Sequence, residues 1–268
     1  MKISFSTLGC PHWSWREITS AAVDLNYQGI EMRGIGTDIS VPVIPIFTEK
    51  NIEHTMDELR RMNLVIPCLD SDCCIHLRDS QAPVDIEVEA YLKLAKTLGT
   101  PYVRIMAAAP VPKPVGTVDE GYVKEHAAKL AKLAQGYGVK LLIETNGIWC
   151  DSGKLAGLLE AVNSQYLGAL WDVHHPYRFK GESPQVTVDN LGPWICHTHM
   201  KDSQKTADGY RYALPGFGDV PLEGAVQALK SIGYDGFYSL EWVKRWDTTL
   251  EEPGIVFAHF ANYMRTLS

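Results

Sequence analysis

The chain alternates from end to end between short apolar runs and longer amphipathic stretches. The short runs are rich in β-branched residues, which is typical of buried strands, and the longer stretches have helical periodicity. Successive runs begin about 30 residues apart, which is the length of one β/α unit. The predicted strands are Ile3–Leu8, Gly29–Met32, Val65–Leu69, Tyr102–Met106, Lys140–Thr145, Gly168–Asp172, Ile195–His199 and Gly236–Glu241. The predicted helices include Asn51–Met62, Val84–Leu98, Tyr122–Tyr137, Lys154–Val162, Leu222–Ile232 and Ile255–Leu267.

Eight strands that alternate with helices over 268 residues predict an α/β fold, a (β/α)8 TIM barrel that forms a single domain over residues 1–268. Glycines follow several predicted helices, where a left-handed C-cap would end the helix before the next strand. No G-x-G-x-x-G follows the first strand, which counts against an open dinucleotide-binding sheet. Pro110–Gly116 and Leu214–Pro221 are predicted to be loops at the barrel mouth.

Charge and composition favour a small-molecule enzyme. The formal net charge is −7, whereas binding to duplex nucleic acid or to a membrane surface usually requires a basic patch. No uninterrupted apolar stretch reaches the roughly 18 residues of a membrane span, and Met1 leads directly into the first strand. The six cysteines include no C-x-x-C pair and are interpreted as reduced thiols. We therefore expect a cytoplasmic protein.

Four late strands each end in a potential metal ligand. The segments KLLIE, LGALWD, ICHTH and FYSLE end at Glu144, Asp172, His199 and Glu241. In a TIM barrel the carboxyl ends of the strands meet at one edge and build the active site. A carboxylate at the end of an apolar strand is costly unless a cation neutralises it. The pattern therefore predicts one divalent ion, and this oxygen-rich set favours Mn²⁺, Mg²⁺ or Co²⁺ and tolerates Zn²⁺.

Each of these residues also has an ordinary structural interpretation. A strand-end carboxylate taken alone is usually a helix N-cap or a surface ion-pair partner. Glu31, at the end of the second strand, is interpreted in that way and left outside the site. His197 and His199 could each be a core histidine, but a ligand on each of four successive strands favours a metal site that includes His199.

The motifs IETN, WDVHH, HTHMKDS, SLEW and PGFGDVPL resemble those of the xylose isomerase-like superfamily of TIM barrels. This group includes the sugar phosphate isomerases and epimerases and the AP endonucleases of family 2, such as endonuclease IV, and the resemblance covers the whole chain. It implies that Glu144, Asp172, His199 and Glu241 hold the metal. It also implies substrate contacts at His175 and Arg211, and we take Lys201 and His197 as further candidates for contacting the substrate.

The resemblance further implies an activity. A metal-dependent sugar isomerase or epimerase moves a proton at a carbon next to a carbonyl, and Glu144 and Glu241 would act as its two bases. Cys150 stands where the ketose epimerases have a glutamate, so no particular ketose specificity is expected. The loops after the seventh and eighth strands mix both signs of charge, which predicts an unphosphorylated carbohydrate substrate.

Three alternatives remain. A dehydratase or lyase acting on an inosose or keto-glycoside would begin with the same proton abstraction. An endonuclease IV-like phosphodiesterase is disfavoured, because the third and fourth strands lack the additional metal histidines. A non-catalytic sugar-binding barrel is disfavoured because both glutamates are present. Homo-oligomerisation stays open.

Overall fold

A computed structural model describes residues 1–108 and 118–267, so the predicted loop Pro110–Gly116 lies outside the described residues. The central strands are β1 (Lys2–Ser6), β2 (Gly29–Glu31), β3 (Cys68–Cys74), β4 (Tyr102–Met106), β5 (Lys140–Glu144), β6 (Leu167–Asp172), β7 (Ile195–Met200) and β10 (Phe237–Leu240). The helices around them are α1 (Trp15–Asp24), α2 (Ile52–Arg61), α3 (Gln81–Leu98), α4 (Glu120–Tyr137), α5 (Ser152–Val162), α6 (Pro184–Leu191), α7 (Leu222–Ser231) and α8 (Pro253–Thr266). Within the described residues, no helix is long and apolar enough to cross a membrane.

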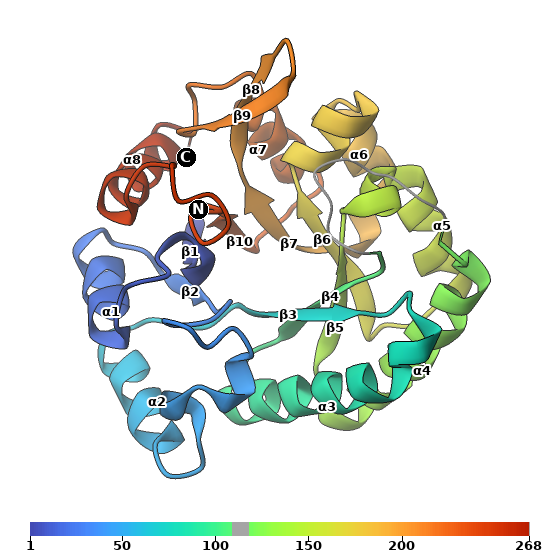
Figure 1. Cartoon of the computed structure of the whole chain (residues 1–268). Coiled ribbons are helices and arrows are strands. Elements are labelled where there is room, and N and C mark those ends of the chain that lie inside the picture. The colour runs from blue at the N-terminus through green and yellow to red at the C-terminus, as the bar shows by residue number, and fades with distance from the viewer. Residues whose placement is uncertain (109–117, 268) are drawn as a thin grey trace.

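All eight central strands are parallel, and their order is β2-β1-β10-β7-β6-β5-β4-β3. Parallel bridges from Gly29 to Val65 and from Met32 to Leu69 join the two ends of this sheet. The sheet thus closes almost completely into a barrel, with the helices arranged around it (Figure 1). The predicted TIM barrel is confirmed.

Several helices begin where a side chain accepts a hydrogen bond from a free backbone N–H group, and some end at a left-handed glycine. Ser14 and Glu17 form a capping box at the start of α1, in which each side chain accepts a hydrogen bond from the other residue's backbone N–H. Gly99 and Gly138 end α3 and α4 in the left-handed region, at φ +70° and +71°. A residue with a Cβ adopts that conformation only at a cost, so glycine makes a sharp stop before the next strand.

The third strand differs most from its prediction. It was expected at Val65–Leu69 but forms at Cys68–Cys74, and Val65 makes only an isolated bridge. Pro67 explains the late start, because proline has no backbone N–H to donate to a neighbouring strand. The polar residues that follow were not recognised as a strand, yet Asp70 lies fully buried inside the barrel.

The connection after β7 contains a hairpin that the sequence did not predict. Strands β8 (Asp202–Thr206) and β9 (Gly209–Ala213) pair in antiparallel fashion, with Thr206 opposite Gly209. Ala207 and Asp208 connect the two strands, and Gly209 begins β9 with a φ of +142°, a conformation that favours glycine. The segment 214–221 that follows is a loop, as expected.

The barrel interior is divided into two layers. The side chains of Cys68, Leu142 and Leu170 form an apolar cluster in the lower part of the barrel. Two residues further along the same strands, the inward positions carry Asp70, Glu144 and Asp172, all buried. Since side chains alternate along a strand, the period of two places this polar layer directly above the apolar one, toward the carboxyl ends of the strands.

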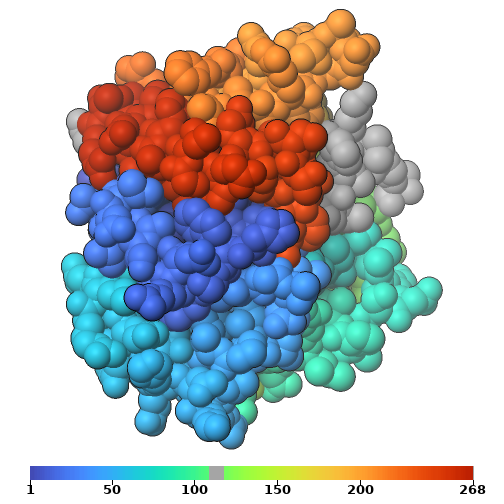
Figure 2. All heavy atoms as spheres, turned by 60° about the vertical axis from the view of Figure 1, so that its left-hand side comes forward, coloured from blue at the N-terminus to red at the C-terminus, as the bar shows by residue number. Residues whose placement is uncertain are grey.

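The first and last β/α units pack against each other and so join the two ends of the chain. The Phe5 ring of β1 stacks on Phe257 of α8, with centroids 4.1 Å apart. The Tyr27 hydroxyl donates a hydrogen bond of 2.7 Å to the carbonyl oxygen of Phe257. Figure 2 shows the N-terminal residues in blue packed against the C-terminal residues in red. These contacts join β1 and Tyr27 to α8, while β1 itself pairs with β10, the strand that directly precedes Glu241.

Candidate metal centre

The four predicted ligands come together at the carboxyl ends of their strands. Glu144 ends β5, Asp172 ends β6, His199 lies near the end of β7, and Glu241 directly follows β10. All four are buried. Ligand atoms of Glu144, Asp172 and His199 lie within 4.8 Å of one another. Glu241 joins them because its Oε1 is 3.5 Å from His199 Nδ1.

A cavity of about 480 Å³ opens at this end of the barrel. Its lining residues are Leu8, Arg33, Asp72, Arg104, Glu144, Asn146, His175, Lys201, Tyr210, Tyr212, Glu241, Val243, Trp246 and Asp247. The two predicted bases, Glu144 and Glu241, therefore border the same space from strands on different sides of the barrel. This is the space in which a substrate would meet them.

Lys201 forms ion pairs with two of the predicted ligands, Asp172 and Glu241. Its Nζ lies 2.7 Å from Asp172 Oδ2 and also donates to Glu241 Oε2. Burial opposes a charged ammonium, but the charges of Asp172 and Glu241 outweigh burial and hold the pKa of Lys201 well above its usual range. Burial likewise tends to raise the pKa of Glu241, but the charge of Lys201 and then that of His199 lower it well below its usual range. The ammonium and the Glu241 carboxylate are both charged at neutral pH.

Glu144 is held by Arg104 of the neighbouring strand β4 and by Asn146, which follows β5. Its Oε2 accepts a 2.8 Å hydrogen bond from Arg104 Nη1, and its Oε1 accepts one of 3.0 Å from Asn146 Nδ2. Arg104 Nε also lies 3.8 Å from Asp70 Oδ1. Burial, followed by the nearby charge of Glu31, raises the pKa of Asp70 well above its usual range. Burial thus favours the neutral form of Asp70, and Glu144 makes the closer contact with the Arg104 guanidinium.

The chemistry of this donor set fits a divalent metal ion. Three carboxylates and one imidazole match the preference of Mn²⁺ and Mg²⁺ for oxygen and also suit Zn²⁺. Among the described residues, the fully buried Nδ1 of His199 has no hydrogen-bond partner. A buried nitrogen without a partner is rare in folded proteins. This nitrogen is therefore available for coordination.

The predicted substrate contacts are only partly brought to the cavity. His175 and Lys201 line it, and His175 Nδ1 lies 3.0 Å from the carbonyl oxygen of Thr145. Arg211 does not line it, because it is exposed on β9 and donates a 2.7 Å hydrogen bond to Gln204 across the hairpin. The alternation along β9 instead brings its two neighbours, Tyr210 and Tyr212, to the cavity wall. The hairpin itself was not predicted, so neither tyrosine was singled out.

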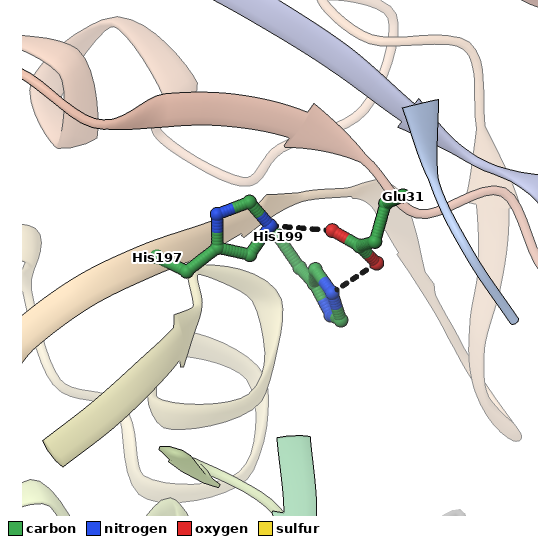
Figure 3. Close-up of side chains that lie close together, drawn as sticks. All are labelled: Glu31, His197 and His199. Carbon is green, nitrogen blue, oxygen red and sulfur yellow. Dashed lines mark hydrogen bonds and ion pairs between the residues drawn. The ribbon is translucent and has the colours of Figure 1, made fainter. Parts of the chain in front are cut away.

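His197 lies deeper than predicted and contacts a residue that the sequence reasoning excluded. Glu31 is fully buried, and one of its oxygens lies 2.5 Å from His197 Nε2 while the other lies 2.8 Å from His199 Nε2 (Figure 3). The interpretation of Glu31 as a cap or surface ion-pair partner is therefore wrong. Burial would raise the pKa of Glu31, but the charges and hydrogen bonds of His199 and His197 hold it well below its usual range. Glu31 lies at the end of a strand, as the four predicted ligands do, and this position could have identified it in the sequence.

A family model described as the xylose isomerase-like TIM barrel matches residues 19–260. The chain belongs to this family. The match covers all eight helices in part or in full and every central strand after β1. The resemblance of the strand-end motifs to the xylose isomerase-like enzymes is thus confirmed.

Two curated relatives are an epimerase and an isomerase by name. The chain is 26% identical over 161 residues to a fructoselysine 3-epimerase of Escherichia coli O157:H7, covering 58% of each chain. It is 25% identical over 203 residues to an inosose isomerase of Halalkalibacterium halodurans, covering 70% of this chain and 72% of the relative. The chain thus spans little more than half the length of the epimerase that it matches.

Solved structures share the fold over nearly the whole chain. The probable 3-DHS dehydratase AsbF of Bacillus anthracis has a TM-score of 0.82 at 20% identity, covering 99% of both chains. A xylose isomerase-like barrel of Mycobacterium smegmatis in complex with magnesium has a TM-score of 0.76 at 14% identity, covering 99% and 96%. The IOLI protein, solved with a zinc atom, has a TM-score of 0.75 at 20% identity, covering 98% and 97%. These likenesses show a shared fold.

Proposed function

We propose that the protein is a divalent-metal-dependent isomerase or epimerase of a sugar or related polyol. The observation that carries the proposal is the placement of two carboxylates, Glu144 and Glu241, on one cavity beside Asp172 and His199. The names of the two curated relatives, an epimerase and an isomerase, support it.

The metal would be held by Glu144, Asp172, His199 and Glu241. The magnesium and zinc in two structural neighbours support a divalent ion of this kind, and the oxygen-rich donor set also suits Mn²⁺ or Co²⁺. When bound, such an ion supplies a Lewis acid that stabilises the negative charge developing on a substrate oxygen.

The two glutamates would do the proton transfer. One takes the proton from the carbon beside the carbonyl, and the other returns a proton from the opposite side. Arg104 and Asn146 orient Glu144, while Lys201 orients Glu241, so both bases are positioned before a substrate arrives. For Glu241, the charges of Lys201 and His199 outweigh burial and lower the pKa, which keeps the carboxylate ionised at neutral pH but makes it a weaker base.

Other residues of the cavity would bind the sugar. His175 is held by the Thr145 carbonyl oxygen and can orient a substrate hydroxyl. Tyr210 and Tyr212, 5.4 Å apart between ring centroids, provide an aromatic wall that excludes water.

The charges of the cavity favour an unphosphorylated substrate. Arg33, Arg104 and Lys201 line it, and each already forms an ion pair with a carboxylate. A phosphate group binds best to uncommitted cations or to a helix N-terminus. Within the part of the chain that the structure describes, the cations on the cavity wall are committed, so we assign a neutral keto-sugar or polyol as substrate.

A dehydratase is the second candidate. It would begin with the same proton abstraction and then expel a hydroxyl group from the neighbouring carbon. The similarity in fold to AsbF, whose name denotes a dehydratase, favours this alternative over other chemistries of the family.

One experiment tests both candidates. The metal-free protein is loaded with Mn²⁺ and incubated in D₂O with ketoses, inososes and keto-glycosides, and NMR follows deuterium entry beside the carbonyl. Deuterium entry with recovery of an epimer or isomer supports the proposal, whereas an enone absorbance identifies a dehydratase. Chelator-treated protein and the Glu144→Gln, Glu241→Gln double variant are the controls. A metal-loaded protein that exchanges deuterium into none of these compounds would contradict the proposal.

A further inference from the structure

The carboxylate of Glu31 joins two histidines across the barrel interior. Glu31 belongs to β2, and His197 and His199 belong to β7, which is separated from β2 in the sheet by β1 and β10. All three side chains are fully buried, and each carboxylate oxygen contacts one ring nitrogen, Nε2 in both histidines (Figure 3).

These contacts determine which nitrogen of His199 faces the metal site. Each carboxylate oxygen of Glu31 faces one Nε2 at hydrogen-bond distance and can accept a hydrogen bond from it, so we assign the ring hydrogen of both histidines to Nε2. His199 Nε2 is therefore committed to Glu31. Its Nδ1, by contrast, has no hydrogen-bond partner among the described residues and lies 3.5 Å from Glu241 Oε1.

We propose that Glu31 is a positioning residue of the metal centre, which fixes His199 with its Nδ1 toward the metal and strengthens that nitrogen as a ligand. A carboxylate that accepts the second N–H of a ligand histidine fixes its tautomer and ring orientation and raises its basicity. His197 holds the other oxygen of Glu31 and so fixes the carboxylate in turn. This inference rests on the proposed metal site, because it concerns one of that site's ligands.

Glu31→Gln is the decisive variant. Glutamine has the size of glutamate, but its NH₂ group accepts no hydrogen bond, so one of the two ring N–H groups loses its acceptor. We expect Zn²⁺ affinity to fall by about 10- to 100-fold, the usual effect of removing such a partner. Competition with a chromophoric chelator measures this affinity without any need for a substrate.

Two further variants separate positioning from folding. His197→Gln leaves the bond between Glu31 and His199 intact but removes the neighbour that orients Glu31, so we expect a smaller loss of Zn²⁺ affinity. This variant decides the question if Glu31→Gln does not fold. Ser4→Ala is the matched control, because Ser4 is fully buried on β1 and its hydroxyl has no hydrogen-bond partner within the described residues. Its Zn²⁺ affinity should equal that of the wild type.

Nitrogen-15 NMR of histidine-labelled protein gives a readout that a purely structural role would not move. In the Zn²⁺-loaded wild type, His199 should retain its proton on Nε2 and bind through Nδ1. In Glu31→Gln that Nε2 proton should shift and exchange faster. Binding through Nε2, or a folded Glu31→Gln protein with wild-type Zn²⁺ affinity, would overturn the inference and leave the metal site standing. A wild type that binds no divalent ion would instead refute the proposed function and this inference with it.

Discussion

Replacement of Lys201 by methionine should make the stability of the protein depend on metal. The Lys201 ammonium is only 2% exposed and lies between the carboxylates of Asp172 and Glu241. Methionine keeps most of the aliphatic chain but removes the charge. In the metal-free protein two buried carboxylates would then share no cation, and breaking a buried ion pair costs about 3–5 kcal/mol.

A divalent ion bound by the same carboxylates should restore much of this loss. At a free metal concentration of 100 times Kd, binding stabilises the folded state by about 2.7 kcal/mol. In the wild type the ammonium competes with the ion for Asp172 and Glu241, whereas in Lys201→Met it does not. The stabilisation by Mn²⁺ should therefore be larger in the variant than in the wild type. Urea unfolding with and without chelator measures both differences.

Lys244→Met is the matched control for this experiment. Lys244 is also buried, but its Nζ donates to the carbonyl oxygens of Thr248 and Leu250 and pairs with the exposed Glu252. Its replacement should destabilise the protein while leaving the stabilisation by Mn²⁺ at the wild-type value. If Mn²⁺ stabilises Lys201→Met no more than the wild type, then Lys201 and the metal do not share ligands, and the reasoning fails.

Three further outcomes follow from the same site. Glu144→Gln and Glu241→Gln keep an oxygen for coordination but cannot accept a proton, so each should lower kcat by about 10²- to 10⁴-fold while the protein stays folded. If a variant retains most of its turnover, the replaced glutamate is not a catalytic base. Metal analysis of the wild type should find close to one divalent ion per chain, and Asp172→Asn should lose it, whereas three ions per chain would indicate a different site. Inorganic phosphate should inhibit turnover poorly at millimolar concentration, and sub-millimolar inhibition would contradict the assignment of an unphosphorylated substrate.

The positions of the proposed metal ligands could be predicted from the sequence because they follow from local rules. The strand period of two fixes which side chains face the barrel interior, and the parallel topology brings the strand ends to one edge. Glu144, Asp172 and His199 needed only correct strand ends, and the predicted ends of β5 to β7 fell within one residue of the observed ones. For such residues, predicting where the strand ends also predicts where in the barrel the side chain lies.

The residues that escaped prediction depend on partners far away in the chain. Glu31 looks like an ordinary strand-end carboxylate, and its partners His197 and His199 come 166 and 168 residues later. Arg211 was assigned as a substrate contact from the family resemblance, but in the hairpin it is exposed, and Tyr212 lines the cavity instead. Neither cross-barrel pairing nor hairpin register can be read from local periodicity.

The charges of the polar layer come both from the predicted metal ligands and from residues that the sequence analysis left out, such as Glu31. The carboxyl groups that face the barrel interior in the described structure belong to Glu31, Asp70, Glu144, Asp172 and Glu241, and the permanent cations beside them belong to Arg104 and Lys201. Five carboxyl groups thus share two permanent cations, although burial raises the pKa of Asp70 well above its usual range and so favours its neutral form. A carboxylate left without a cation is costly in a buried site, unless a neighbouring histidine takes up a proton or a divalent ion binds. Each carboxylate is visible in the sequence, but only the fold shows which of them already have a cation. The excess of carboxylates over cations is the strongest electrostatic argument for one divalent ion at this site.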